Sequence, residues 1–255
     1  MRGRFVWYEL MTTDPAAAKG FYTKVVGWGT QDWPGSNPPY WMWIRGEAPV
    51  GGLMQLPEEA RKGGAPPHWL AYVSVPDVDQ SVEQAKGMGA MVHVPPTEIP
   101  EIGRFAVLAD PQGAAFAVFK ALSHGGIPDK SPQTGDFSWH ELVTTDLDAA
   151  FRFYSALFGW EKTTAMDMGP MGVYQMYGVP GHELGGMFNR PPDIPAPPHW
   201  MLYVKVDDID QSTERVKSAG GQILNGPMEV PGGDWIVQCM DPQGAAFSLH
   251  AAKKD

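Results

Sequence analysis

The chain has 255 residues, of which 43% are hydrophobic and 19% are charged, and its formal net charge is −10 at pH 7. This apolar content suffices for two packed domains and argues against extensive disorder. The acidic balance disfavours a nucleic-acid partner, because such binding needs Lys and Arg clusters that neutralise phosphates. No apolar run reaches the ~18 residues of a membrane span, and the single cysteine, Cys239, excludes a disulfide within the chain. We therefore expect a soluble cytoplasmic protein with no membrane association.

In chain order, the first half of the sequence predicts a strand, a helix and three strands, and then the same series again. The opening strand is a β-branched and aromatic run, and the first helix has Asp14 as its N-cap and ends at Gly27. Pro and Gly turns separate the short strands that follow. The expected strands are 5–12, 28–32, 40–45, 50–56, 69–75, 91–94, 105–109 and 115–120, and the expected helices are 15–26 and 78–88.

The second half of the chain repeats the first. Residues 5–14 return as 137–146, which is 132 positions later. Two further landmarks, Pro-Pro-His-Trp and Asp-Pro-Gln-Gly-Ala-Ala-Phe, return 131 positions later. A period this long matches a whole small domain rather than a solenoid repeat, so the sequence indicates a tandem duplication.

The duplication predicts an α+β fold made of four βαβββ modules. We expect a first domain over residues 1–122, a linker rich in Gly, Pro, Ser and Asp over 123–136, and a second domain over 137–255. The expected strands of the second copy include 139–144, 174–177, 201–206, 236–240 and 246–250, and its expected helices are 147–158 and 209–219.

Four short motifs carry a family resemblance. Thr-Thr-Asp opens the first helix of each copy, Phe-Tyr and then Gly-Trp follow it, and Asp-Pro-Gln-Gly-Ala precedes the last strand. With the four modules, this set resembles the vicinal oxygen chelate superfamily, which includes glyoxalase I, bleomycin-resistance proteins and extradiol dioxygenases. The resemblance implies that two modules curl their sheets into an open cup. In the family's enzymes a divalent metal in the cup chelates two neighbouring oxygens of the substrate.

The residues at the superfamily's ligand positions are not metal ligands in this sequence. The positions that the resemblance assigns hold Trp7 and Trp139, Leu70 and Met201, and Ala117 and Ser248. The fourth position falls within 51–55 and 185–189, where no carboxylate occurs. We therefore expect the usual metal site to be absent from both cups.

Other polar residues are predicted to face the cups. Side chains of a strand alternate between its two faces, so Glu9 and Glu141 share a face with Trp7 and Trp139. The same alternation predicts further residues that line the cups. These are His68 and Tyr72 in the first copy, and His199, Tyr203 and His250 in the second.

A displaced metal site is one hypothesis for the second cup. If the opening and closing strands of the last module pair antiparallel, as the resemblance implies, His199 and His250 lie opposite each other. With Glu141 they would form a set of two histidines and one carboxylate that suits Fe(II), Mn(II) or Zn(II). The alternative is that His199, at a strand start, only makes a hydrogen bond at the sheet rim.

Two functions stay open at this stage. The first is a glyoxalase-like enzyme, of lyase, isomerase or dioxygenase type, that acts on a small molecule in the second cup, where His140, Lys205 and Gln238 replace less polar residues of the first copy. Glu141 would be its base or a metal ligand, and His199 or Tyr203 would polarise a carbonyl. The second is a drug-sequestering protein that binds small molecules without metal. Association into a homodimer is compatible with both.

Overall fold

The computed structural model describes residues 2–122, 131–192 and 196–253. The first copy contains β1 (Phe5–Thr12), α1 (Pro15–Val26), β2 (Gly29–Asp32), β3 (Tyr40–Arg45), β4 (Ala48–Gln55), α2 (Glu58–Lys62), β5 (His68–Ser74), α3 (Val78–Gly87), β6 (Met91–Ile99), β7 (Gly103–Ala109) and β8 (Ala115–Ala121). The second contains β9 (Phe137–Thr144), α4 (Leu147–Phe158), β10 (Glu161–Asp167), a short 3-10 helix (Gly169–Met171), β11 (Val173–Val179), β12 (His182–Asn189), β13 (His199–Lys205), α5 (Ile209–Ser218), β14 (Gln222–Glu229), β15 (Trp235–Met240) and β16 (Ala246–Ala251).

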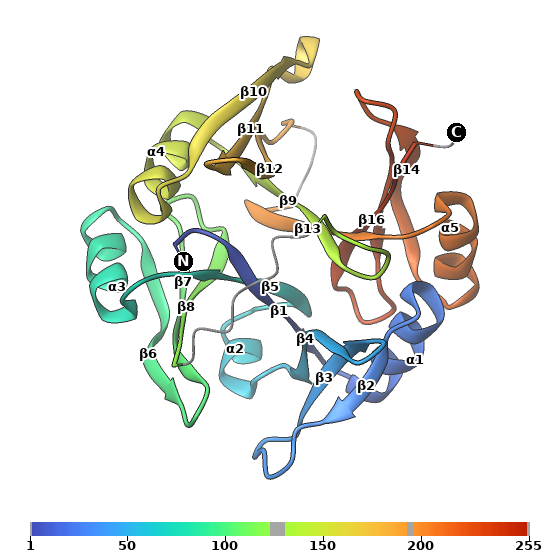
Figure 1. Ribbon diagram of the computed structural model, residues 1–255, viewed down its shortest axis with the longest axis horizontal. Coiled ribbons are helices and arrows are strands. Elements are labelled where there is room, and N and C mark those ends of the chain that lie inside the picture. The colour runs from blue at the N-terminus through green and yellow to red at the C-terminus, as the bar shows by residue number, and fades with distance from the viewer. Residues whose placement is uncertain (1, 123–130, 193–195, 254–255) are drawn as a thin grey trace. The chain divides into compact units, whose positions relative to one another are not determined.

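The element order confirms the predicted α+β fold of four βαβββ modules (Figure 1). Asp14 caps α1 by accepting a hydrogen bond from the Ala17 backbone N–H, and Gly27 ends the helix in a left-handed conformation. The short helix α2 was not expected, and it lies in the connection between the two modules of the first copy. The expected linker at 123–136 lies partly outside the described residues.

Each copy forms one eight-stranded mixed sheet. The strand order is β2-β3-β4-β1-β5-β8-β7-β6 in the first and β10-β11-β12-β9-β13-β16-β15-β14 in the second. Within each module the opening strand runs parallel to the closing strand, as β1 does to β4 and β13 does to β16. The hairpins within the modules are antiparallel. Both sheets end in edge strands and are therefore open.

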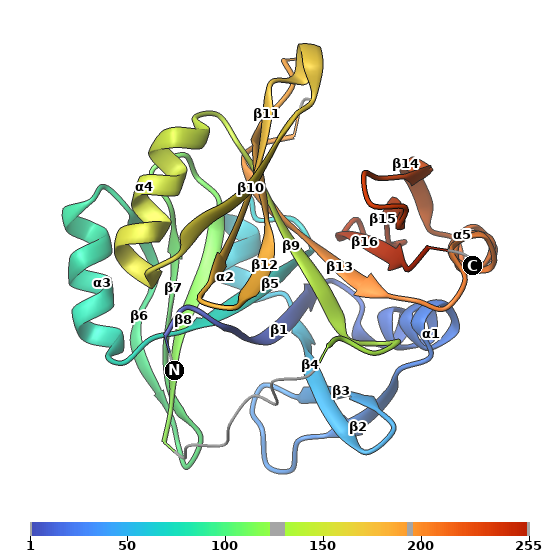
Figure 2. The ribbon, with the colours of Figure 1, turned by 45° about the horizontal axis from the view of Figure 1, so that its top comes forward.

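The chain also divides into two compact units that cut across the duplication. The first takes its described residues from 1–6, 71–129 and 139–201, and the second from 7–70, 130–138 and 202–255. Each unit thus combines one module of each copy. Helix α3 lies beside α4 in the first unit, and α1 lies beside α5 in the second (Figure 1 and Figure 2).

A buried hydrogen-bonded set joins the two modules within each unit. In the second unit, Trp69 Nε1 donates to Tyr22 Oη (2.9 Å), and Tyr22 Oη donates to Asp241 Oδ2 (3.1 Å). The other oxygen of Asp241 accepts the backbone N–H groups of Gln243 and Ala245. The first unit repeats the pattern with its own residues. There the donors and acceptor are Trp200, Tyr154 and Asp110, with contacts of 3.1 and 3.0 Å.

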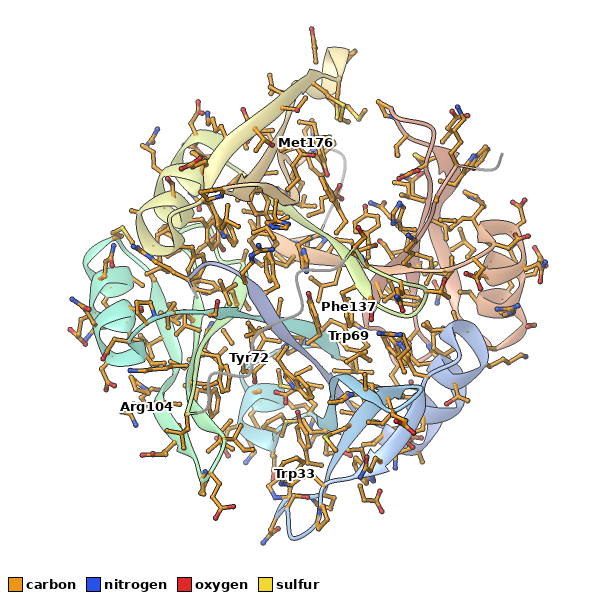
Figure 3. All side chains as sticks on the ribbon, viewed as in Figure 1. Trp33, Trp69, Tyr72, Arg104, Phe137 and Met176 are labelled. Carbon is orange, nitrogen blue, oxygen red and sulfur yellow. The ribbon has the colours of Figure 1, made fainter. Side chains whose placement is uncertain are left out.

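These sets account for the repeated landmarks of the sequence, because each landmark supplies one member. Phe-Tyr supplies the tyrosine, Pro-Pro-His-Trp the tryptophan, and Asp-Pro-Gln-Gly the aspartate. Burial raises the pKa of Asp110 and of Asp241, although hydrogen bonds to both carboxyls act in the opposite direction. The surrounding core is largely aromatic. Phe137 packs edge-to-face on Trp69, with ring centroids 5.4 Å apart (Figure 3).

Among the described residues, none of the helices combines the length and the apolar character needed to cross a bilayer.

Candidate functional site

A buried carboxylate in the second copy is held by two aromatic side chains. Trp139 and Glu141 lie on β9, and Tyr174 lies on β11. Trp139 Nε1 donates to Tyr174 Oη (2.8 Å), and Tyr174 Oη donates to Glu141 Oε2 (2.9 Å). Glu141 is only 7% exposed. Because one tyrosine contacts both residues, Trp139 and Glu141 project from the same face of β9, as the strand alternation predicts.

The first copy contains the same arrangement. Trp7 Nε1 donates to Tyr40 Oη (2.9 Å), and Tyr40 is hydrogen-bonded to Glu9, which is also buried. Burial and the neighbouring Glu9 charge raise the pKa of Tyr40, so its hydroxyl stays protonated and acts as a donor. We call each set of three residues the Trp–Tyr–Glu triad of its copy.

A glycine makes room for the tyrosine of each triad. Gly186 on β12 is the register partner of Glu141 in the parallel β9–β12 ladder, and Gly52 is the partner of Glu9. A Cβ atom on Gly186 would overlap the ring of Tyr174, and one on Gly52 would overlap the hydroxyl of Tyr40. The glycine therefore lets the tyrosine ring lie across the strand and reach the glutamate.

The triad gives a buried carboxyl group a hydrogen-bond donor. An unpaired buried charge is costly, and a hydroxyl donor offsets part of that cost while favouring the charged form. The carboxylate has further acceptor capacity, since two oxygens offer about four lone-pair directions. Chemically, Glu9 and Glu141 can accept a hydrogen bond or a proton from a bound molecule.

The two strand-start histidines make matching backbone contacts. His68 Nδ1 lies 2.7 Å from the carbonyl oxygen of Pro66, and His199 Nδ1 lies 2.7 Å from that of Pro197. Because a carbonyl only accepts, Nδ1 carries the proton in both rings, which leaves Nε2 as the acceptor of a neutral imidazole. Burial lowers the pKa of His199. The rim hydrogen bond considered from the sequence is therefore present, and His199 is a neutral acceptor near pH 7.

The expected approach of His199 to His250 is wrong. It required antiparallel pairing of the last module's opening and closing strands, but β13 and β16 run parallel. The register places His250 opposite Lys205, which is six residues beyond His199 in the sequence. Both ring nitrogens of His250 already have protein partners, since Nδ1 lies 2.9 Å from Ser138 Oγ and Nε2 lies 2.9 Å from Asp234 Oδ2.

The tyrosines of the closing modules differ in their surroundings. Tyr203 Oη accepts a hydrogen bond from Gln238 Nε2 (3.2 Å), whereas Tyr72 packs against Phe105 with ring centroids 6.1 Å apart. His140 does not share a face with Glu141. It is buried, stacks on Phe5 at 3.7 Å and contacts the Leu184 carbonyl oxygen through Nδ1. His140 therefore adds no hydrogen-bonding group to the triad of the second copy.

The residues present do not fit the superfamily's divalent metal. The first ligand position holds Trp7 and Trp139, whose indole N–H groups are donors used within the triads. In the part of the chain that the structure describes, no three His, Cys, Asp or Glu side chains lie together as a metal site would require. This includes the hypothetical set of Glu141, His199 and His250.

Sequence reasoning missed the tyrosines of both triads. Tyr40 lies 33 residues after Trp7, and Tyr174 lies 35 residues after Trp139. No local sequence period links these tyrosines to β1 or β9. One signal was available, because Tyr-x-Met recurs as residues 40–42 and 174–176 at equivalent places in the two copies. Ser138 and Asp234, the partners of His250, have no equivalent polar residue in the first copy and so left no repeat signal.

Comparisons with known proteins agree with this architecture of duplicated modules. The model of the Glyoxalase/Bleomycin resistance protein/Dioxygenase superfamily matches residues 4–118 and 137–249. The chain belongs to this superfamily.

Several relatives match nearly the whole chain. "Putative glyoxylase CFP32" of Mycobacterium tuberculosis is 36% identical over 246 residues, which cover 95% of this chain and 92% of that protein. "Anthracycline biosynthesis protein DauV" of Streptomyces sp. (strain C5) is 30% identical over 260 residues, which cover 97% and 92%.

Solved structures share the fold. The Mn(II)-bound glyoxalase from Novosphingobium aromaticivorans superposes with a TM-score of 0.66 at 17% identity, covering 99% of this chain and 83% of that one. The 2,3-dioxygenase LapB from Pseudomonas sp. KL28 gives 0.66 at 11% identity, covering 100% and 94%.

Proposed function

We propose that this protein binds a small organic molecule without the superfamily's divalent metal, and that Glu9 and Glu141 are its polar anchors. The observation that carries the proposal is the pair of Trp–Tyr–Glu triads. In each triad a tryptophan occupies the family's first ligand position, and its indole N–H is used to hold the tyrosine that contacts the glutamate. The buried carboxylate then takes the place of the metal as the polar group that binds the ligand.

Room for a ligand supports the proposal in the first copy. A hollow of about 440 Å³ lies beyond the ends of β1 and β4, with Thr13, Met54 and Leu56 among its lining residues. Met54 stands two residues after Gly52 and so shares the face of Gly52. The hollow therefore lies near the strand ends on that face, and Trp7, Tyr40 and Glu9 are not among its lining residues.

The name of one relative supports an organic ligand. That relative is named for anthracycline biosynthesis, and aromatic side chains form each triad of this chain. A planar ligand could stack on the triad tryptophan while its hydroxyl donates to the glutamate. We therefore propose a neutral or cationic aromatic compound with a hydroxyl or amine donor as the ligand class.

The test combines metal analysis with ligand binding. Protein purified without chelator is analysed for bound metal, and binding of hydroxylated polycyclic compounds is followed by tryptophan fluorescence. We expect binding without stoichiometric metal, and Glu141→Gln should weaken it about tenfold or more, because a hydrogen bond to a charged group contributes ~1.5–3 kcal/mol. Glu9→Gln is the matched variant for the first copy. Metal at one equivalent per copy, or affinities that neither substitution changes, would reject the proposal.

Acid–base catalysis in the second copy is a second candidate. It is favoured by the burial of Glu141 beside Trp139 and by the lowered pKa of His199, which keeps that imidazole neutral. In this reaction Glu141 would take a proton next to a carbonyl of the bound molecule, with neutral His199 as a second proton acceptor. Turnover of a thiol adduct of a 2-oxoaldehyde, abolished by Glu141→Gln and retained in Glu9→Gln, separates this candidate from binding alone. Cytoplasmic location and a homodimeric state stay predictions.

A further inference from the structure

Three side chains of the second copy form a continuous hydrogen-bonded line. Ser138 Oγ, at the start of β9, lies 2.9 Å from His250 Nδ1 on β16. His250 Nε2 lies 2.9 Å from Asp234 Oδ2, in the turn before β15. All three residues belong to the same compact unit. We call them the Ser–His–Asp set, and nothing in the proposed ligand site uses them.

The Asp234 carboxylate fixes the direction of its hydrogen bond with His250. Burial alone would raise the pKa of Asp234, but hydrogen bonds from His250 and from the Lys253 backbone N–H outweigh it and lower that pKa. The Asp234 carboxylate is thus an acceptor, so Nε2 of His250 carries the ring proton. In the tautomer that carries its proton on Nε2, Nδ1 is a lone pair to which the Ser138 hydroxyl can donate.

A second acceptor competes for the Ser138 proton but lies farther away. The carbonyl oxygen of Tyr203 is 3.3 Å from Ser138 Oγ, compared with 2.9 Å for His250 Nδ1. The shorter contact is the stronger one, because hydrogen bonds from hydroxyls have their optimum near 2.7–2.8 Å. The serine is therefore held against a base that a carboxylate orients, which is the arrangement of an activated nucleophile.

The first copy shows that the fold does not require these residues. Val6, Phe119 and Gly103 occupy the equivalent positions of Ser138, His250 and Asp234. A Cβ on Gly103 would collide with the ring of Phe119, so that position is closely packed in the first copy. In the second copy all three positions are polar and bonded to one another.

The set is reachable from solvent. The His250 side chain is 19% exposed and that of Asp234 is 44% exposed, and Ser138 is half-buried. A base that is partly covered keeps its orientation.

We propose that Ser138 is an activated nucleophile that is acylated by carboxylic esters, with His250 as its base and Asp234 as the residue that orients the base. Ser138 Oγ forms a bond to the ester carbonyl carbon while its proton passes to Nδ1 of His250. The bond from that carbon to the alcohol oxygen breaks, and the leaving oxygen takes the proton from Nδ1. Water then attacks the acyl-serine with the same base, which yields the acid and restores the serine hydroxyl.

The test uses the full chain and p-nitrophenyl acetate. Acetylated residues are mapped by peptide mass spectrometry, and release of nitrophenol gives the rate. We expect acetyl on Ser138, and we expect its rate of acetylation to fall about 100-fold in His250→Phe, the low end of the contribution of a positioned base. Asp234→Asn should lower the rate less than His250→Phe, because the base remains.

The first copy supplies the controls. Ser138→Val and His250→Phe introduce the residues of that copy, and circular dichroism and thermal unfolding establish that each variant is folded. Should either unfold, Asp234→Asn serves in its place, since its side chain is the most exposed of the three. Acetylation confined to lysines or the N-terminus would overturn the proposal. Equal Ser138 acetylation in the wild type and in a folded His250→Phe or Asp234→Asn variant would also overturn it.

Discussion

The hydroxyl of Tyr22, on the first helix of the first copy, donates to Oδ2 of Asp241, in the last turn of the second copy. Both groups are buried, and the Trp69 indole N–H donates in turn to Tyr22. The reciprocal contact joins Tyr154, on the first helix of the second copy, to Asp110, in the last turn of the first copy. Residues that recur in sequence thus bond across the duplication rather than within one copy.

Tyr22→Phe should lower the free energy of unfolding by about 2 kcal/mol, because a buried carboxylate loses a charge-assisted hydrogen bond. Chemical denaturation at pH 7 measures the loss. Asp241→Asn and the double variant complete a thermodynamic cycle. A coupling energy near zero between the two substitutions would show that the bond contributes nothing to stability.

The second copy alone should not be a folded monomer. In a fragment of residues 137–255, Asp241 lacks Tyr22 and Tyr154 lacks Asp110. Two such fragments can satisfy each other, because the missing partners are equivalent residues of the duplication. Sedimentation equilibrium should therefore give a dimer that dissociates and unfolds together on dilution. A folded monomer would contradict this expectation and support the domain boundaries proposed from the sequence as independent folding units.

The sequence predicted the modules well because their signals are local. The Asp14 cap, Gly27 and the repeated motifs lie within or next to the elements that they define. The glutamates of the site were also predictable, since strand alternation needs only neighbouring residues. The pairing of β13 with β16 was not, because a parallel or antiparallel register depends on the path of the chain between strands. The same reason hid Tyr174, which reaches Glu141 from another strand.

Gly186→Ala should disturb the second triad. The added Cβ overlaps the ring of Tyr174, so the ring must move and its hydrogen bond to Glu141 lengthens or breaks. We expect a loss of stability of about 1–3 kcal/mol and weaker ligand binding in the second copy. Denaturation and fluorescence titration measure the two effects.

Gly20→Ala is the control for that substitution. Gly20 is exposed on α1, and a Cβ there meets no atom within 4 Å. Alanine should be neutral or stabilise this helix by up to about 1 kcal/mol. If both glycine substitutions gave the same loss, the close approach of Tyr174 to Gly186 would not be its cause.

His140 should make the fold less stable in acid. Burial lowers its pKa from the ordinary 6.5 to about 4, so the unfolded chain binds the proton more tightly than the folded one. Its contribution to stability is therefore complete above pH 6.5 and is lost as the pH falls from there toward 4. By linkage the loss between pH 7.5 and pH 5 is about 2 kcal/mol.

The matched variant is His140→Tyr, which introduces the residue of the first copy. Tyr8 stacks on Phe137 at 3.8 Å as His140 stacks on Phe5 at 3.7 Å, so a tyrosine ring suits this packing. Denaturation at pH 7.5 and at pH 5 measures the free energies of unfolding of the wild type and the variant. Relative to the wild type, the variant should be more stable at pH 5 than at pH 7.5. Tyr8→Phe is the control, because burial raises the pKa of Tyr8 and no proton is exchanged there in this range. Parallel pH profiles of wild type and His140→Tyr would show that the histidine is not the group that titrates.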